Sequence, residues 1–248
     1  MNRFFVEEKA INNGIISIEG SDAHHIAQVL RFKVGQNICV VCAGLVFETE
    51  TISITKNRVE AKITSQKPGI NEPDLDVYLL QGLAKGDKMD LIIQKSVELG
   101  VHAIVPVAFE RSVVQFVGEK AAKKQARWQQ ISAEAAKQCG RDKIPQVYPV
   151  CNLQEALQIP PKGAFLLMPW EEEKNTGLRA VLPQISPKSL AIIIGPEGGI
   201  DETEAILARS KGAKTVSLGP RILRTETAGL VVIAIVMYQW ANFGGPVA

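Results

Sequence analysis

The chain has 248 residues, of which 46% are hydrophobic and 22% are charged. This balance excludes an intrinsically disordered protein, in which low hydrophobicity and high net charge prevent a core from forming. The length suffices for two domains, and the net charge of +2 is too small by itself to indicate a nucleic-acid partner.

Secretion and membrane insertion are not expected. The first ten residues, MNRFFVEEKA, lack the cationic region and the apolar run of a secretory signal. The longest apolar run, residues 228–238, is shorter than the roughly 18 residues that indicate a membrane span. We therefore expect a cytoplasmic protein with no membrane partner.

The cysteines and histidines do not form a metal-binding pattern. Cys39 and Cys42 make one isolated CxxC. The other candidates lack the spacing of zinc ligands; they are Cys139, Cys151, His24, His25 and His102. We expect reduced cysteines and no metal.

The first 70 or so residues are rich in short β-type runs separated by turn-prone residues. These runs are residues 15–18, 38–41, 46–54 and 59–63. They predict a small β-barrel with one short helix near residues 24–30. The segment 66–73, QKPGINEP, has the proline, glycine and asparagine content of a linker.

After the linker, strands alternate with helices. The expected strands are 77–80, 103–107, 146–150, 164–168, 190–194 and 215–218, and the expected helices are 87–99, 119–139, 152–158, 201–211 and 225–240. This alternation predicts an α/β domain whose mainly parallel sheet is covered on both faces. Ligands of such sheets bind beyond the carboxyl ends of the strands.

Two stretches lie at such strand ends. The first, GPEGGI at residues 195–200, follows a buried strand, and its three glycines let the backbone approach a ligand closely. It is neither a Walker A loop nor a GxGxxG fingerprint, which disfavours nucleoside triphosphates. A glycine-rich turn with no ligand remains an alternative.

The second stretch, LGPRILRTETAG at residues 218–229, leads into the most apolar helix. Capping explains Thr225 and Glu226 at the start of that helix. It does not explain Arg221 and Arg224, because the helix dipole disfavours cations at this end. These arginines indicate an anionic ligand.

Positive charge is concentrated in two segments. Residues 110–143 hold eight Lys or Arg against four acids, a balance of +4, and residues 205–225 hold five Lys or Arg and no acid. Such segments suit a surface that contacts phosphates. Solvated helix faces are the alternative.

Together the two glycine-containing stretches resemble the SPOUT class of RNA methyltransferases, and specifically the RsmE family of 16S ribosomal RNA uridine-N3 methyltransferases. Other stretches that resemble this family are HHIAQVLR (24–31), QGLAKGDKMDLIIQKSVELGV (81–101), ERSVV (110–114) and EAAKQCGR (134–141). The resemblance implies a PUA-like barrel for RNA at residues 1–70 and a methyltransferase domain with a deep trefoil knot at residues 74–243. It also implies S-adenosylmethionine as cofactor and a homodimer that often uses the last helix.

The resemblance also implies the site residues. For the cofactor they are Leu167, Met168, Gly195, Glu197, Gly198, Gly199, Leu218, Gly219, Leu223, Arg224, Thr225, Thr227 and Ala228. Methyl transfer to uridine N3 also requires loss of the N3 proton. Arg224 is the candidate for stabilising the uridine anion, and Glu197 or Glu226 for accepting the proton.

RNA contacts are expected in both domains, on 16S rRNA or the small ribosomal subunit. The candidates are His24, His25, Arg31, Arg111, Arg127 and Arg141. Two other functions remain open, a SPOUT enzyme of other specificity such as a ribose 2′-O methyltransferase, and a non-catalytic RNA-binding protein of ribosome assembly.

Overall fold

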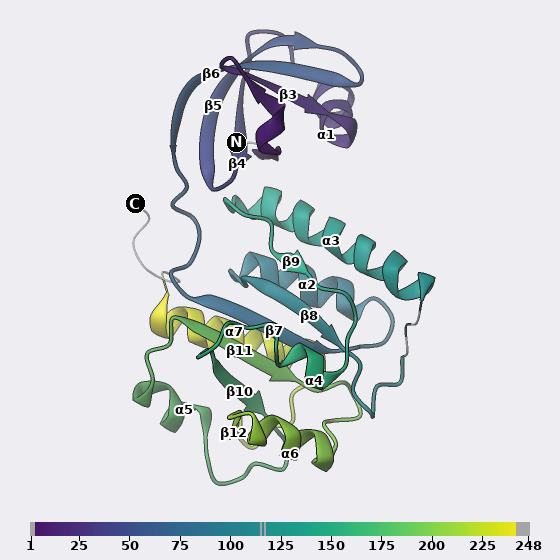
Figure 1. Ribbon diagram of the computed structural model, residues 1–248, viewed down its shortest axis with the longest axis vertical. Coiled ribbons are helices and arrows are strands. Elements are labelled where there is room, and N and C mark those ends of the chain that lie inside the picture. Colours follow the sequence, from purple (N-terminus) through teal and green to yellow (C-terminus); the bar gives the residue numbers. More distant parts are fainter. Residues whose placement is uncertain (1–2, 115, 117, 242–248) are drawn as a thin grey trace. The chain divides into compact units, whose positions relative to one another are not determined.

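Figure 1 shows the computed structural model of the chain, which describes residues 3–114, 116 and 118–241. The chain divides into two compact units. Unit 1 covers the described residues of Met1–Glu72 together with Ala136–Ile144, and unit 2 covers those of Pro73–Ala135 and Pro145–Ala248. The expected domains, 1–70 and 74–243, stay a prediction, and their residues 1–2 and 242–243 lie outside the described part.

Unit 1 is mostly β-structure. Its elements are β1 (Arg3–Phe5), the 3₁₀ turn η1 (Glu8–Ala10), β2 (Ile11–Asn12), β3 (Ile15–Glu19), α1 (Gly20–His24), the π-helical turn η2 (His25–Val29), β4 (Asn37–Cys42), β5 (Leu45–Ile54) and β6 (Arg58–Pro68). The sheet order is β1-β4-β5-β6-β3-β2, and only the β1–β4 pair is parallel among the pairs of this sheet. The β-rich start is therefore confirmed.

Alternation along the strands explains the core of unit 1. In β4, Ile38 and Val40 enter the main cluster, whereas Cys39 and Val41 enter a second, smaller one, because successive side chains point to opposite faces. Ala43 (φ 47°) and Gly44 (φ 79°) join β4 to β5 in left-handed conformations, as a two-residue hairpin turn requires.

The linker prediction is partly wrong, because β6 continues three residues into the 66–73 segment. Lys67 and Pro68 pair with Val46 and Leu45 of β5. Composition marks these residues as linker-like, but pairing with a long neighbouring strand keeps them extended.

A buried ion-pair cluster ties the 136–144 segment into unit 1. Arg141 Nη2 lies 2.5 Å from Glu72 Oε2, and Glu72 Oε1 accepts hydrogen bonds from the backbone N–H groups of Asp142 (2.8 Å) and Lys143 (3.1 Å). Asp142 in turn pairs with Arg3 and accepts a hydrogen bond from the Asn71 N–H. The cluster therefore connects three separate stretches of chain.

Breaking this cluster should destabilise unit 1. Burial alone raises the pKa of Glu72, but the Arg141 side chain and the two backbone donors outweigh it and lower that pKa below its ordinary 4.5. The stabilisation is therefore present above pH 4.5 and is lost as the pH falls through the lowered folded-state pKa. Glu72→Gln should cost roughly 3 kcal/mol at neutral pH, because it removes the negative charge from a largely buried ion pair.

Urea unfolding followed by circular dichroism checks this prediction, with hydrogen exchange in β4 and β5 assigning the transition to unit 1. Glu50→Gln, at an exposed position of β5, is the matched control and should stay within about 0.5 kcal/mol of wild type. Equal stability of Glu72→Gln and wild type at neutral pH would contradict the account.

Unit 2 is an α/β unit. Its elements are β7 (Asp76–Gly82), α2 (Lys88–Glu98), β8 (Ala103–Val107), α3 (Glu119–Cys139, whose last four residues belong to unit 1), β9 (Gln146–Val147), α4 (Leu153–Ala156), β10 (Phe165–Pro169), α5 (Leu178–Val181), η3 (Leu182–Gln184), β11 (Ser189–Ile194), α6 (Glu202–Ser210), β12 (Lys214–Val216) and α7 (Thr225–Trp240). All pairs in its sheet, ordered β12-β10-β11-β7-β8-β9, are parallel. The predicted α/β class with a mainly parallel sheet is confirmed, and the trefoil knot stays a prediction.

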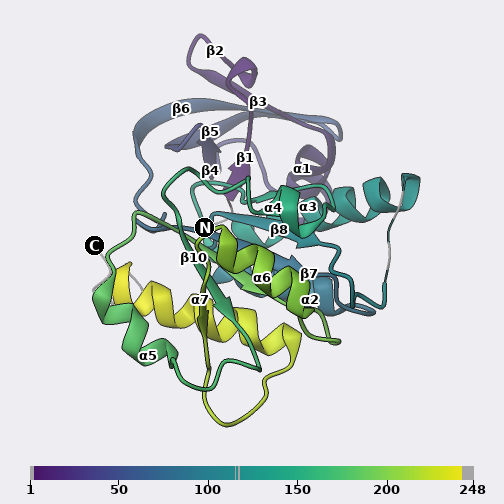
Figure 2. The same cartoon turned by 60° about the horizontal axis from the view of Figure 1, so that its bottom comes forward.

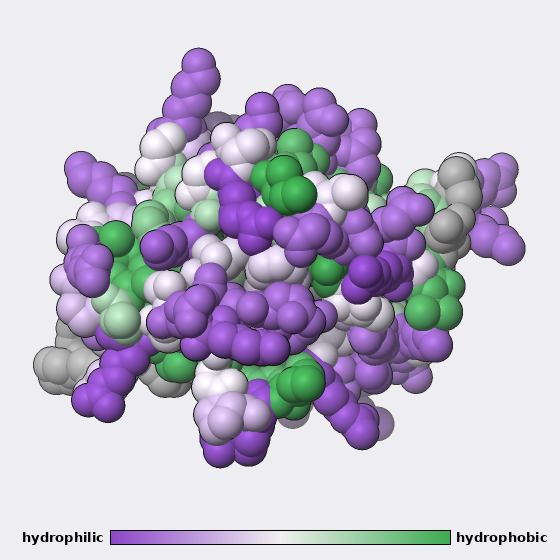
Figure 3. Space-filling model, turned by 90° about the horizontal axis from the view of Figure 1, so that it is seen from below, coloured by the Kyte–Doolittle hydropathy of each residue, from purple (hydrophilic) through white to green (hydrophobic). Residues whose placement is uncertain are grey.

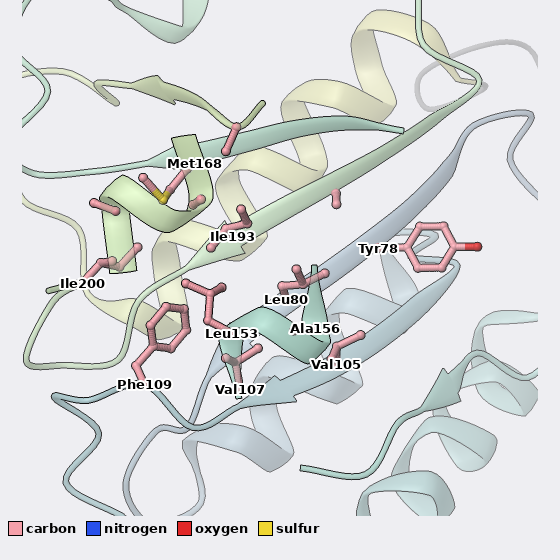
Figure 4. Packing of buried hydrophobic residues seen from close by; sticks show 14 of the residues in the cluster. Tyr78, Leu80, Val105, Val107, Phe109, Leu153, Ala156, Met168, Ile193 and Ile200 are labelled. Atoms are coloured by element: carbon pink, nitrogen blue, oxygen red, sulfur yellow. The ribbon is translucent and has the colours of Figure 1, made fainter. Parts of the chain in front are cut away.

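Both faces of this sheet are covered (Figure 1, Figure 2). On one face, Leu80 and Ile193 pack with Ala205 of α6 and Leu153 of α4 in a single apolar cluster (Figure 4). The other face carries α7, whose Gly229 has Leu79 and Ile194 side-chain atoms 3.5 Å from the position that a Cβ would take. The central strands are mostly hydrophobic because both of their faces are buried.

The face of the protein drawn in Figure 3 is mostly polar. Hydrophilic residues cover most of that face, and hydrophobic ones gather in small separate patches. Among the described residues, no helix combines the length and the apolar character that a membrane span needs.

Candidate functional site

A cavity of about 730 Å³ lies in unit 2 where three neighbouring strands end. β10, β11 and β12 lie side by side and parallel, so the loops that follow them converge at one edge of the sheet. The cavity is lined by Pro169, Trp170, Glu171, Glu172, Glu173, Lys174, Ile194, Gly195, Pro196, Gly199, Ile200, Ser217, Leu218, Gly219, Pro220, Arg221, Ile222, Leu223, Thr225 and Ala228.

The loop after β11 is a tight turn held against its neighbours. The Gly199 N–H donates to the Pro196 carbonyl at 3.0 Å, and Gly199 has φ +76°. A Cβ built there would lie 2.2 Å from the Glu171 carboxylate. Asp201 then caps α6 in a capping box with Glu204. The absence of a side chain at residue 199 thus allows Glu171 to approach the turn.

A buried hydrogen-bond chain joins this loop to α7. The Gln81 side-chain amide at the end of β7 donates to Thr225 Oγ1 at 2.8 Å, and Thr225 Oγ1 donates to the Gly195 carbonyl at 2.6 Å. Gln81 is fully buried and Thr225 nearly so. The two predicted stretches are therefore held in a fixed relation by a residue of a third strand.

The loop after β10 forms the third wall and is fixed by Glu173. Its carboxylate accepts the N–H groups of Asn175 and Thr176, both at 2.9 Å, and the Thr215 hydroxyl of β12 at 2.8 Å. These hydrogen bonds, that of Thr215 first, hold the pKa of Glu173 below its ordinary value. Glu173 is therefore ionised at neutral pH, and its carboxylate holds the loop after β10 against β12.

The structure brings seven of the thirteen predicted cofactor residues to the cavity wall. They are Gly195, Gly199, Leu218, Gly219, Leu223, Thr225 and Ala228. The other six, Leu167, Met168, Glu197, Gly198, Arg224 and Thr227, are not among the described lining residues.

The cofactor contacts expected of Leu167 and Met168 stay a prediction. Both side chains are fully buried in β10, and Met168 belongs to the core cluster shown in Figure 4. Side chains of a strand buried on both faces face the core until the strand ends. The wall therefore begins one residue later, at Pro169 and Trp170.

Glu197 and Glu226 share one cation. Lys88 Nζ, at the start of α2, lies 3.1 Å from Glu197 Oε1 and 3.1 Å from Glu226 Oε2. Glu197 also accepts the Lys85 N–H at 3.1 Å. Burial raises the pKa of each carboxyl, but hydrogen bonds from backbone N–H groups and Lys88 outweigh it, so both pKa values are lowered. Both groups are ionised at neutral pH and are weak bases.

Arg224 makes a longer contact with one of these two carboxylates. It is the residue before α7, its side chain is 81% exposed, and its Nη1 lies 4.0 Å from Glu226 Oε1. Its neighbours Leu223 and Thr225 line the cavity. The guanidinium is thus a largely exposed cation beside the cavity.

The residues predicted to contact RNA differ in accessibility. His24, His25 and Arg31 are exposed in unit 1. In unit 2, Arg111 and Arg127 are also exposed, but each is ion-paired, with Asp201 at 3.0 Å and with Asp90 at 2.6 Å. The role of Arg141 in RNA binding stays a prediction. In the structure Arg141 is only 5% exposed and pairs with Glu72.

Sequence reasoning missed the β10 wall and two supporting residues. The run EEEK at 171–174 is a charge run of the kind that solvated loops carry, so it gave no local signal. Gln81 and Lys88 lie 144 and 109 residues before the partners they hold, Thr225 and Glu197. Only the three-dimensional arrangement shows these contacts.

Comparison with protein families matches most of the chain. A model described as an RNA methyltransferase domain matches residues 71–237. A model described as an RNA methyltransferase PUA domain matches residues 18–64. The two matches together cover the mostly-β and the α/β parts of the fold.

Individual relatives extend over nearly the full length. The chain is 37% identical to ribosomal RNA small subunit methyltransferase E of Bacillus subtilis, covering 96% of this chain and 97% of that one. It is 34% identical to the protein of the same name from Mesomycoplasma hyopneumoniae, covering 94% and 97%. A crystal structure of such an enzyme from Neisseria gonorrhoeae bound to S-adenosyl methionine superimposes with a TM-score of 0.86 at 36% identity, covering 98% and 99%. The chain belongs to the ribosomal RNA small subunit methyltransferase E family.

Proposed function

We propose that this chain transfers a methyl group from S-adenosylmethionine to N3 of a uridine in 16S ribosomal RNA. The observation that carries the proposal is the cavity at the ends of β10, β11 and β12, which is lined by both stretches on which the family resemblance rests. The similarity over nearly the full length to relatives named as small-subunit rRNA methyltransferases supports the substrate class. We place the activity in the cytoplasm.

The cavity suits an adenosyl cofactor. Its volume lies within the ~300–1,000 Å³ of small-molecule sites. Ile194, Ile200 and Leu218 offer apolar walls, and the glycine turns expose backbone groups that can pair with an adenine edge. The Glu171 carboxylate at the wall is complementary to a cationic ligand.

Calorimetry with S-adenosylmethionine separates an enzyme from a non-catalytic RNA-binding protein. We expect saturable binding of one cofactor per chain. A chain that binds RNA but gives no heat with the cofactor would support the binding protein and overturn the proposal.

Arg224 has the central role in the proposed reaction. The bound cofactor supplies an already activated methyl group, so the protein mainly positions the reactants. Uridine N3 becomes nucleophilic as it passes its proton to solvent water or hydroxide, and a guanidinium beside the cavity stabilises the resulting anion. Pairing with Lys88 lowers the pKa values of Glu197 and Glu226, which makes either carboxylate a weak acceptor for the N3 proton.

RNA binding is proposed for both units. His24, His25 and Arg31 offer exposed donors and a cation in unit 1. In unit 2, Arg111 and Arg127 are exposed enough to reach phosphates, in competition with the carboxylates they now pair with. Their contribution should therefore be strongly salt-dependent.

We also propose that a second copy of the chain covers α7. The helix is apolar over most of its length, yet Ile235 and Tyr238, one turn apart, are 37% and 74% exposed. Aromatic anchors dominate the energetics of interfaces. Tyr238→Asp should weaken dimerisation at least about tenfold, measured by analytical ultracentrifugation, whereas Tyr148→Phe leaves α7 unchanged and is the control. A wild-type chain that is monomeric at micromolar concentration would contradict this proposal.

A further inference from the structure

We infer that Lys88 is a positioning residue that keeps Glu226 from capturing Arg224, so that the Arg224 guanidinium stays available to the uridine anion. This inference rests on the proposed function and assigns a role to a residue of α2, outside both pocket loops. Lys88 does not line the cavity, and it acts through Glu226.

The competition for Glu226 is visible in the distances. Lys88 Nζ lies 3.1 Å from Glu226 Oε2, whereas Arg224 Nη1 lies 4.0 Å from Glu226 Oε1. The Glu226 side chain is 16% exposed, so its charge is only partly screened by water. Lys88 thus holds the carboxylate at direct contact distance, and Arg224 remains at the edge of interaction.

Glu197 depends less on Lys88 than Glu226 does. It accepts the Lys85 N–H at 3.1 Å in addition to the Lys88 ammonium. If Lys88 were removed, Glu197 would keep a backbone donor. Among the described residues, Arg224 would then be the nearest cation recorded for Glu226.

Capture of Arg224 by Glu226 would neutralise a charge that the reaction needs. A bidentate Arg–carboxylate pair is a strong and oriented interaction, and Arg224 needs to close less than about 1.5 Å to reach the ordinary contact distance. An Arg224 held in this way would no longer stabilise an anion in the cavity. Lys88 is therefore expected to influence the chemical step more than cofactor binding.

The test compares turnover of labelled methyl into small ribosomal subunits by wild type, Lys88→Met, Lys88→Arg, Glu226→Gln and the double variant Lys88→Met/Glu226→Gln. We expect Lys88→Met to lose roughly tenfold in kcat, with a steeper rise of rate with pH and an unchanged cofactor affinity. Lys88→Arg and the double variant should recover most of the rate.

Lys95→Met is the matched control. Lys95 lies on the same helix and pairs with Glu98 at 2.8 Å, away from the cavity, so its loss should leave kcat unchanged. An unaffected Lys88→Met, or a loss that Glu226→Gln does not repair, overturns the inference. A wild-type chain without turnover overturns the proposed function instead, so the two failures are distinguishable.

Discussion

Gly82→Ala should weaken cofactor binding by about a hundredfold or more. A Cβ at residue 82 would lie 2.4 Å from the Pro196 nitrogen and 2.7 Å from the Gly195 carbonyl carbon. Both are backbone atoms of the turn that lines the cavity, so no side-chain rotation relieves the clash. Either β7 or the turn must move.

The stability cost of this substitution should be moderate. Overpacking of a buried site typically costs about 1–3 kcal/mol, so we expect a folded protein with a displaced pocket turn. Calorimetry with S-adenosylmethionine measures the affinity and thermal unfolding measures the stability. If the Gly82→Ala variant binds S-adenosylmethionine with the wild-type affinity, the 195–196 turn is not part of the site.

Gly177→Ala is the matched control for this prediction. Gly177 also lies in unit 2, has φ −79°, and has nothing within 4 Å of the position of a Cβ. Alanine fits there without strain, so cofactor affinity should be unchanged and stability should stay within about 0.5 kcal/mol. A loss of affinity in Gly82→Ala but not in Gly177→Ala would therefore be due to the close approach of β7 to the 195–196 turn.

Arg224→Ala should lower kcat by roughly 10²–10³ while leaving cofactor affinity nearly unchanged. The Arg224 side chain is 81% exposed, so its removal should not disturb folding. It is proposed to act on the charge that develops at uridine N3, and this charge appears only on the way to the transition state. Arg224→Lys should recover part of the rate, since it keeps the charge but loses the planar fork of donors.

A pH profile distinguishes this role from a structural one. Higher pH favours the uridine anion without help from the protein, so the Arg224→Ala rate should rise more steeply with pH than the wild-type rate. Arg179→Ala, at an exposed position of α5 outside the cavity, should behave as wild type. Equal turnover of Arg224→Ala and wild type would remove Arg224 from the mechanism.

The regular elements of unit 2 could be predicted because their signals are local. Helices expected at 119–139 and 225–240 coincide with α3 and α7, and the strand expected at 103–107 coincides with β8. Long helical patterns and short β-branched runs each carry their own periodicity. The family prediction rested on two glycine-containing motifs and four further stretches in the expected order along the chain, and it is confirmed.

Short and non-local features could not be predicted in this way. α5 and η3 have four and three residues, too few to show a period. The third cavity wall depends on β10 lying between β11 and β12, an order that no local pattern encodes. Arg141 was taken as a surface cation because its partner Glu72 lies 69 residues earlier in the chain.

The roles assigned to the acidic residues of the site differ most between the sequence-based prediction and the structure. Glu197 and Glu226 are acids at the start of a loop and of a helix, and either could have been a base. Their shared contact with Lys88 makes them ionised partners of a cation instead. Arg224 is left as the residue on which the proposed proton step depends.

The most direct test of the central claim is the position of the transferred methyl group. Small ribosomal subunits are incubated with this protein and isotopically labelled S-adenosylmethionine, and their 16S RNA is digested and analysed by mass spectrometry. We predict that the label appears in a uridine methylated at base nitrogen N3. Label on a ribose 2′-oxygen, or no label in 16S RNA, would contradict the account.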